Sequence, residues 1–178
     1  MSTNKTPIPV KITSIDYRTA NHQMIEKNTW EYEENNNRYE EICGEKREEI
    51  SLRMNNLYAL LNKREPALYM DIHAQALSLR QEIQNSIAEN MQRLSKYNAK
   101  YNIANGERIE YYATGYGMKV TDKQRTELIC KDLAERKRSL ELIETYIEFL
   151  RECKFNCDSI GYAIKNFVSL LTYLSFEK

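Results

Sequence analysis

The sequence PALYMDIHAQALSLRQEIQNSIAENMQRLSKYNAKY, Pro66 to Tyr101, decides the fold. Its apolar residues recur at intervals of three and four, with Gln75 as the polar exception, and this spacing is typical of an amphipathic helix. A proline disfavours helical geometry at the preceding Glu65 and can itself open a helix, so we predict a helix start at Pro66. The pattern continues past Tyr101, and Gly106 favours either a kink or a chain end that needs close approach of the backbone. The repeating residues are Leu68, Ile72, Gln75, Leu79, Ile83, Ile87, Met91, Leu94 and Tyr97.

The segment before this helix predicts a second long helix. Apolar residues at roughly helical spacing run from Ser14, a plausible N-cap, to about Lys63. The stretch ENNNR, residues 34–38, and Gly44 are poor helix formers, so we expect a bend or break at each. The opening PIPVKITSI, residues 7–15, alternates apolar and polar residues and is short extended structure at best.

The segment after it predicts a loop and a third long helix. The loop is ATGYGMKVTDKQ, residues 113–124, which contains two glycines and a Thr-Asp pair able to cap a helix that starts near Asp122. Gly161 then punctuates the pattern, and we expect a short amphipathic helix after it. The apolar residues of the third helix keep a three-four register typical of antiparallel pairs and coiled coils; they are Leu133, Leu140, Ile143, Ile147, Leu150 and Cys157.

Composition agrees with a mainly α fold, a long-helix bundle with little or no β structure. Only five glycines and three prolines occur in 178 residues, which leaves few turns for a sheet of many strands. We expect one closely coupled unit with three parts. These are an N-terminal extension with an acidic helix (1–65), a helix and loop (66–118), and C-terminal helices (119–178).

The formal net charge of zero conceals an acidic stretch and a basic one. Residues 26–49 carry nine acids and four bases, whereas residues 93–138 carry eleven bases and six acids. A polyanionic partner would therefore have to bind a local patch. The longest apolar run, residues 167–176, is about half the length of a bilayer span, so we expect no membrane anchor.

Catalytic and metal-binding motifs are absent from the sequence, and we predict a non-enzymatic protein without a cofactor. The two histidines, His22 and His73, have no second ligand at a metal-like spacing, and the GYG sequence lacks the lysine of a phosphate loop. The four cysteines, at positions 43, 130, 153 and 157, are read as reduced thiols. Cys153 and Cys157 are expected to be small buried apolar residues.

Basic and aromatic residues alternate from position 93 to position 119. Single-stranded nucleic acid offers phosphates to cations and exposed bases to aromatic rings, so this pattern is a candidate DNA-binding stripe. The alternative is that the tyrosines are half-buried bundle residues and the cations a solvated face. The candidate DNA-binding residues are Arg93, Lys96, Lys100, Arg108, Tyr111, Tyr112 and Lys119.

Three motifs resemble the UvsY family of phage recombination mediators. RIEYYATG, residues 108–115, is similar to the family's signature of an arginine, an apolar residue, an acidic residue, two aromatics, small residues and a glycine. GYAIK, residues 161–165, resembles the turn before the family's last helix, and PALY, residues 66–69, resembles the start of its first long helix. The resemblance covers roughly residues 66–178. Gly106 stands where the family commonly has a lysine, and the first 65 residues extend beyond the typical family length.

The resemblance implies a mediator that binds single-stranded DNA and promotes loading of a RecA-like recombinase in place of the single-strand-binding protein. It also implies a ring-like homo-oligomer, formed through the C-terminal region, in the cytoplasm of an infected host cell. The alternative is a structural or adaptor helical oligomer that does not bind DNA. The residues assigned to oligomerisation are Ile147, Leu150, Ile160, Ile164, Phe167, Leu171 and Leu174.

Overall fold

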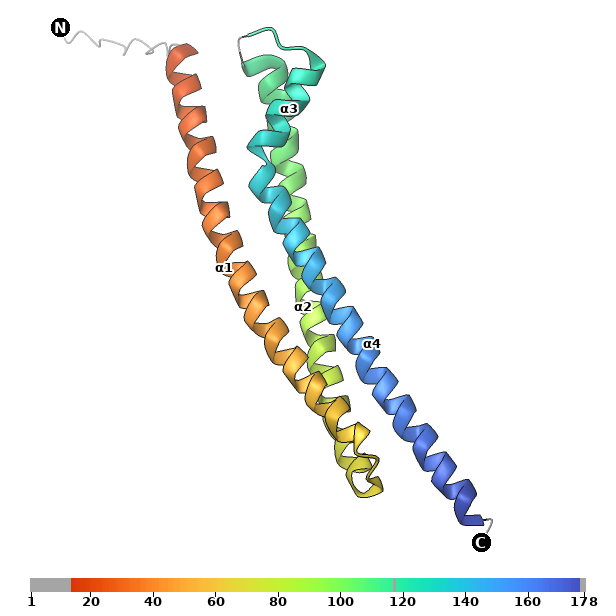
Figure 1. The fold of residues 1–178 in the computed structure, drawn as a ribbon. Coiled ribbons are helices and arrows are strands. Elements are labelled where there is room, and N and C mark those ends of the chain that lie inside the picture. Colours follow the sequence, from red (N-terminus) through yellow and green to blue (C-terminus); the bar gives the residue numbers. More distant parts are fainter. Residues whose placement is uncertain (1–13, 117, 177–178) are drawn as a thin grey trace, which may run out of the picture.

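A computed structural model describes residues 14–116 and 118–176, and within them every regular element is a helix (Figure 1). The mainly α prediction is confirmed. The predicted extended structure of the opening segment falls almost entirely outside the described residues. In chain order the elements are α1 (Ser14–Asn62), η1 (Pro66–Leu68), α2 (Tyr69–Glu110), η2 (Tyr111–Gly115), α3 (Asp122–Asp132) and α4 (Ala134–Phe176).

The three long helices form an elongated antiparallel arrangement. After the tight turn at residues 63–65 the chain reverses from α1 into α2, and it reverses again in the loop between η2 and α3. Helix α3 then leads in the same direction into α4, which lies along α2 (Figure 1). The turn contains Arg64 in a left-handed conformation with a φ of 56°, and Leu68 N–H donates to the Glu65 carbonyl at 3.0 Å. The predicted helix start at Pro66 is therefore a short 3₁₀ turn that leads directly into α2.

The sequence predicts a bend or a break at ENNNR and at Gly44; a break at either place is wrong, because α1 runs through both without interruption. Asn36, a weak helix former, is buried against the start of α4. Its amide nitrogen donates to the Glu135 carbonyl at 2.8 Å, and Ser139 Oγ donates to its amide oxygen at 2.6 Å. These bonds satisfy a buried amide that would otherwise be costly, and the tertiary contact thus outweighs the weak propensity.

Gly106 and Gly161 also lie inside continuous helices, so the separate final helix predicted after Gly161 is wrong. The break occurs instead at Leu133, between α3 and α4, where φ is −103° and ψ is 5°. The Leu133 side chain is buried although its backbone is not helical. The apolar pattern in the sequence therefore includes Leu133 and does not reveal the break. The predicted cap is confirmed: Thr121 and Gln124 form a reciprocal capping box at the start of α3.

One apolar core joins α1, α2 and α4, so helices from all three predicted ranges contribute to it. Helices α2 and α4 supply most of this core, and eight residues of their predicted three-four registers are buried in it, while Gln75 and Met91 are exposed. The most deeply buried side chains are Ile72, Leu79, Ile83, Ile143, Leu150 and Ile160.

Several residues assigned to oligomerisation belong to this intrachain core. Ile147, Leu150, Ile160 and Ile164 are buried within the single chain and cannot reach a second copy unless the bundle opens. Phe167 is half-buried and stacks on Tyr69 with ring centroids 5.7 Å apart. Of the seven residues, Leu171 and Leu174 remain largely exposed, at 43% and 49%.

The cysteines differ in their access to solvent. Cys43, Cys153 and Cys157 are buried, Cys130 is exposed, and all four are free. The prediction that Cys153 and Cys157 are small buried apolar residues is confirmed. Burial raises the pKa of the Cys157 thiol to about 11, and its sulfur lies 3.5 Å from Met54 Sδ.

We expect one thiol of the native protein to react quickly with a disulfide reagent such as DTNB at pH 8. Thiolates are the reactive species, and burial keeps the other three thiols protonated and inaccessible. The measurement is the number of thiols titrated before and after unfolding in guanidinium chloride. Cys130→Ser should remove the fast phase, and more than one fast thiol in the wild type would contradict the core packing described above.

Candidate nucleic-acid interface

The RIEYYATG motif forms the end of α2 and a turn of π-helix. The turn spans Tyr111–Gly115, and its i→i+5 hydrogen-bond pattern is frequently found at functional sites. Three rings meet edge to face: Tyr111 and Tyr112 at 5.1 Å between centroids, Tyr112 and Tyr116 at 5.0 Å, and Tyr111 and Tyr116 at 6.0 Å. A Cβ at Gly115 would lie 3.2 Å from Tyr111 Cδ2, which is a tight contact. The absence of a side chain at position 115 therefore leaves room for the Tyr111 ring.

Asp132, the last residue of α3, binds the polar groups of the motif. The Tyr112 hydroxyl donates to Asp132 Oδ2 at 2.8 Å, and Arg108 Nε lies 3.8 Å from the same oxygen. The side chains of Arg108 and Asp132 are only 14% and 13% exposed. Burial and the bond to the carboxylate raise the pKa of Tyr112 well above its usual range. Arg108 and Tyr112 therefore hold α3 against α2.

The motif residues predicted to bind DNA are only partly available to a nucleic acid. Tyr112 is buried, whereas Tyr111 and Tyr116 are half-buried with part of each ring open to solvent. Lys119 is exposed in the loop that follows. From Glu107 to Asp132 the chain carries five basic and five acidic residues, so this segment has no net charge to attract phosphates.

Arg93, Lys96 and Lys100 form an exposed line of cations on α2, here called the basic strip. Their spacing of three and four residues places them on one side of the helix. Residues 90–106 contain no aspartate or glutamate, and among the residues the structure describes none lies within ion-pair distance of the strip. The strip is the part of the predicted stripe with uncompensated positive charge.

Two tyrosines lie under the basic strip. The Arg93 guanidinium stands 5.0 Å from the centre of the Tyr39 ring of α1, and Lys100 Nζ is 5.8 Å from the centre of the Tyr97 ring. The Tyr39 hydroxyl donates to Asn90 Oδ1 at 2.9 Å, which links α1 to α2. These cation–π contacts order the cations without neutralising them.

The predicted residues thus fall into two groups along α2. The basic strip is one, and the RIEYY end with Lys119 in the following loop is the other. Eight residues separate Lys100 from Arg108, which is about 12 Å along the helix axis. We missed Asp132 because nothing in the local sequence marks an acid in a basic stretch as the partner of a motif 20 residues earlier. Tyr116 continues the run of aromatics in the loop after the motif, although it is not among the residues predicted to bind DNA.

Comparisons with family models, with curated proteins and with solved structures find no match for this chain. The resemblance to recombination mediators is thus carried by the sequence motifs themselves. No group of three or more histidine, cysteine, aspartate or glutamate residues that could hold a metal ion occurs in the described part of the chain. None of the helices over that same part is both long and apolar enough to cross a membrane.

Proposed function

We propose that this protein binds single-stranded DNA through the basic strip and acts as a recombination mediator, which helps a RecA-like recombinase to replace the single-strand-binding protein. The observation that carries the DNA-binding part is the strip itself, three exposed cations on one side of α2 with no acid among residues 90–106. The mediator role, its two protein partners and the host-cell cytoplasm come from the motif resemblance.

The chemistry of the strip suits a flexible single strand. Cations on a helix bind the phosphates, and the half-buried Tyr97 and Tyr101 of the same stretch of α2 are the aromatic side chains proposed to contact bases. Three cations alone give weak binding. Several copies in one closed assembly would engage a single strand with avidity, and the exposed end of α4 with Leu171 and Leu174 is the proposed contact between copies.

Replacing Arg93, Lys96 and Lys100 together with alanine should weaken oligonucleotide binding about tenfold or more at low salt. Loss of three phosphate contacts should also lower the slope of log affinity against log salt by about 2 per subunit. The measurement is fluorescence anisotropy of a labelled oligothymidylate between low and moderate salt. A matched control replaces Lys46, Lys63 and Arg151, which are also exposed and lie outside the strip.

The two triple variants have equal net charge. If the strip binds DNA, the strip variant must therefore lose more oligonucleotide affinity than the control variant. Equal losses in both variants would show that binding depends on overall charge and would remove the strip from the proposal. A wild-type protein that binds no oligonucleotide at low salt would remove DNA binding altogether.

A second candidate function is a helical adaptor that does not bind DNA. The burial of Tyr112 and the contact between Arg108 and Asp132 favour it, because the most distinctive motif then serves to join α2 to α3. Under this function the protein assembles normally, yet the same titration shows no change in anisotropy.

A further inference from the structure

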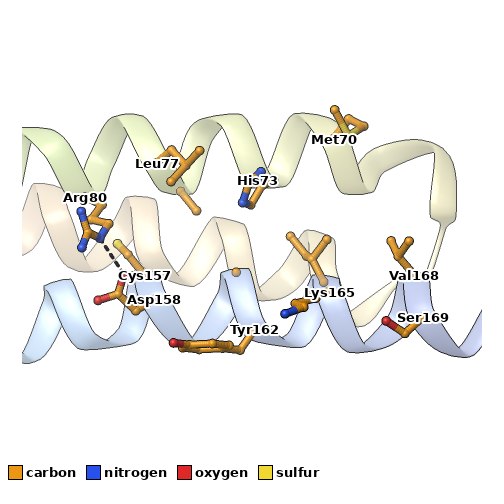
Figure 2. Close-up of a pocket in the computed structure, with 13 residues that line it drawn as sticks. Met70, His73, Leu77, Arg80, Cys157, Asp158, Tyr162, Lys165, Val168 and Ser169 are labelled. Carbon is orange, nitrogen blue, oxygen red and sulfur yellow. Dashed lines mark hydrogen bonds and ion pairs between the residues drawn. The ribbon is translucent and has the colours of Figure 1, made fainter.

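An apolar groove of about 520 Å³ lies between α2 and the C-terminal half of α4 (Figure 2). Its two sides come from Met70–Arg80 of α2 and Cys157–Ser169 of α4, and α1 lies behind it. The floor is made by buried residues, among them Ala76 and Ile164. Cys157, which also lines the groove, contacts Met54 of α1, so α1 already covers the opposite side of the α2–α4 pair. The groove side is the side on which α1 does not lie.

The sides of the groove carry large apolar side chains that no other part of the described chain covers. Leu77 is 51% exposed and Tyr162 is 68% exposed, and Met70 and Val168 are similarly open. The α2 side extends over eleven residues, about 15 Å or three helical turns. A groove between two antiparallel helices accepts a third helix, as α1 demonstrates on the other side, and a further helix would complete a four-helix arrangement.

Charge identifies the kind of helix that fits. The one carboxylate in the lining, Asp158, is engaged by Arg80, whose Nε lies 2.6 Å from its Oδ1. Lys165 is exposed at the rim and His73 is half-buried there. The uncompensated charge at the rim is therefore positive.

We propose that this groove binds an amphipathic helix of a partner protein, about three turns long, with carboxylates beside its apolar face. Apolar residues at positions i, i+3, i+4 and i+7 of that helix would cover Leu77 and Tyr162, and its acids would meet Lys165. The apolar end of α4 of a second copy matches less well, because residues 168–175 contain no acid. The proposal does not depend on DNA binding.

The test is a display library of 14-residue helices with leucine fixed on one face and the other positions randomised among Glu, Lys, Gln and Ala. Selection uses the full-length protein, with counter-selection on Leu77→Glu. We expect the enriched peptides to carry an excess of glutamate. The best of them should bind at least tenfold more weakly to Leu77→Glu and to Lys165→Glu, and within twofold of wild type to Leu52→Glu, whose leucine is exposed on α1 at 62%.

Circular dichroism shows whether each variant keeps its helices, and Lys165→Glu alters an exposed residue, so it tests the site even if Leu77→Glu fails to fold. Three outcomes would overturn the proposal. These are no enrichment above counter-selection, enrichment of lysine in place of glutamate, and self-association of the wild type that Leu77→Glu abolishes in sedimentation velocity. The last outcome would assign the groove to a second copy of this chain.

Discussion

Leu150→Ala should lower the free energy of unfolding by about 2–5 kcal/mol, enough to remove a large part of the stability of a protein of this size. Leu150 is 0% exposed and lies in the core that joins α1, α2 and α4. The substitution removes buried apolar surface and leaves a cavity that long packed helices cannot close. Urea unfolding followed by circular dichroism at several protein concentrations measures the effect.

The concentration series separates the two roles given to Leu150. If it packs within one chain, the loss is the same at every concentration; if it packs between copies, the loss is small in the monomer and grows as the oligomer forms. Leu52→Ala, at a residue exposed on α1, is the control and should change stability by no more than about 0.5 kcal/mol. A cost below about 1 kcal/mol for Leu150→Ala would contradict the packing of the core.

Asp132→Ala should destabilise the protein by about 1–3 kcal/mol through loss of the contact between α2 and α3. The substitution leaves the Arg108 guanidinium and the Tyr112 hydroxyl without the carboxylate that now binds both, in a place where water reaches them poorly. A double-mutant cycle with Arg108→Ala measures the coupling between the two residues in urea unfolding. Glu127→Ala, at an exposed position on α3, is the control.

The same cycle decides what the RIEYYATG motif is for. A structural Arg108 predicts that Arg108→Ala loses stability while the oligonucleotide titration follows the basic strip. An Arg108→Ala variant that keeps its stability and loses DNA binding would contradict this role and make the motif the DNA contact.

Tyr112 also gives this contact a pH dependence. Its pKa is raised in the folded protein, so the neutral hydroxyl is favoured there, and the stability it contributes is present below the ordinary tyrosine pKa of about 10. As the pH rises above that value the unfolded chain ionises first, and the folded state loses this advantage. Tyr112→Phe should therefore show a shallower fall in stability above pH 10 than the wild type.

Sequence periodicity predicted the helical class, the turn before Pro66, the capping box at Thr121 and the buried faces of α2 and α4. These succeed because a three-four apolar repeat and a local cap depend on residues within one or two turns. The predicted breaks at ENNNR and Gly161 are wrong, because the helix propensity of a few residues contributes little free energy compared with tertiary packing. Asn36 gains two hydrogen bonds from α4, nearly a hundred residues away in the chain, and no local rule contains that gain.

The candidate site also has one part that the sequence predicts and one part that only the tertiary structure shows. The line of Arg93, Lys96 and Lys100 could be read from the sequence, because spacing alone puts these cations on one side of a helix. Only the tertiary structure showed that Asp132 binds Arg108 and Tyr112, and that most of the predicted oligomerisation residues lie inside the chain's own core. Burial of a side chain depends on which elements pack over it, and the chain brings those together over distances that no sequence window spans.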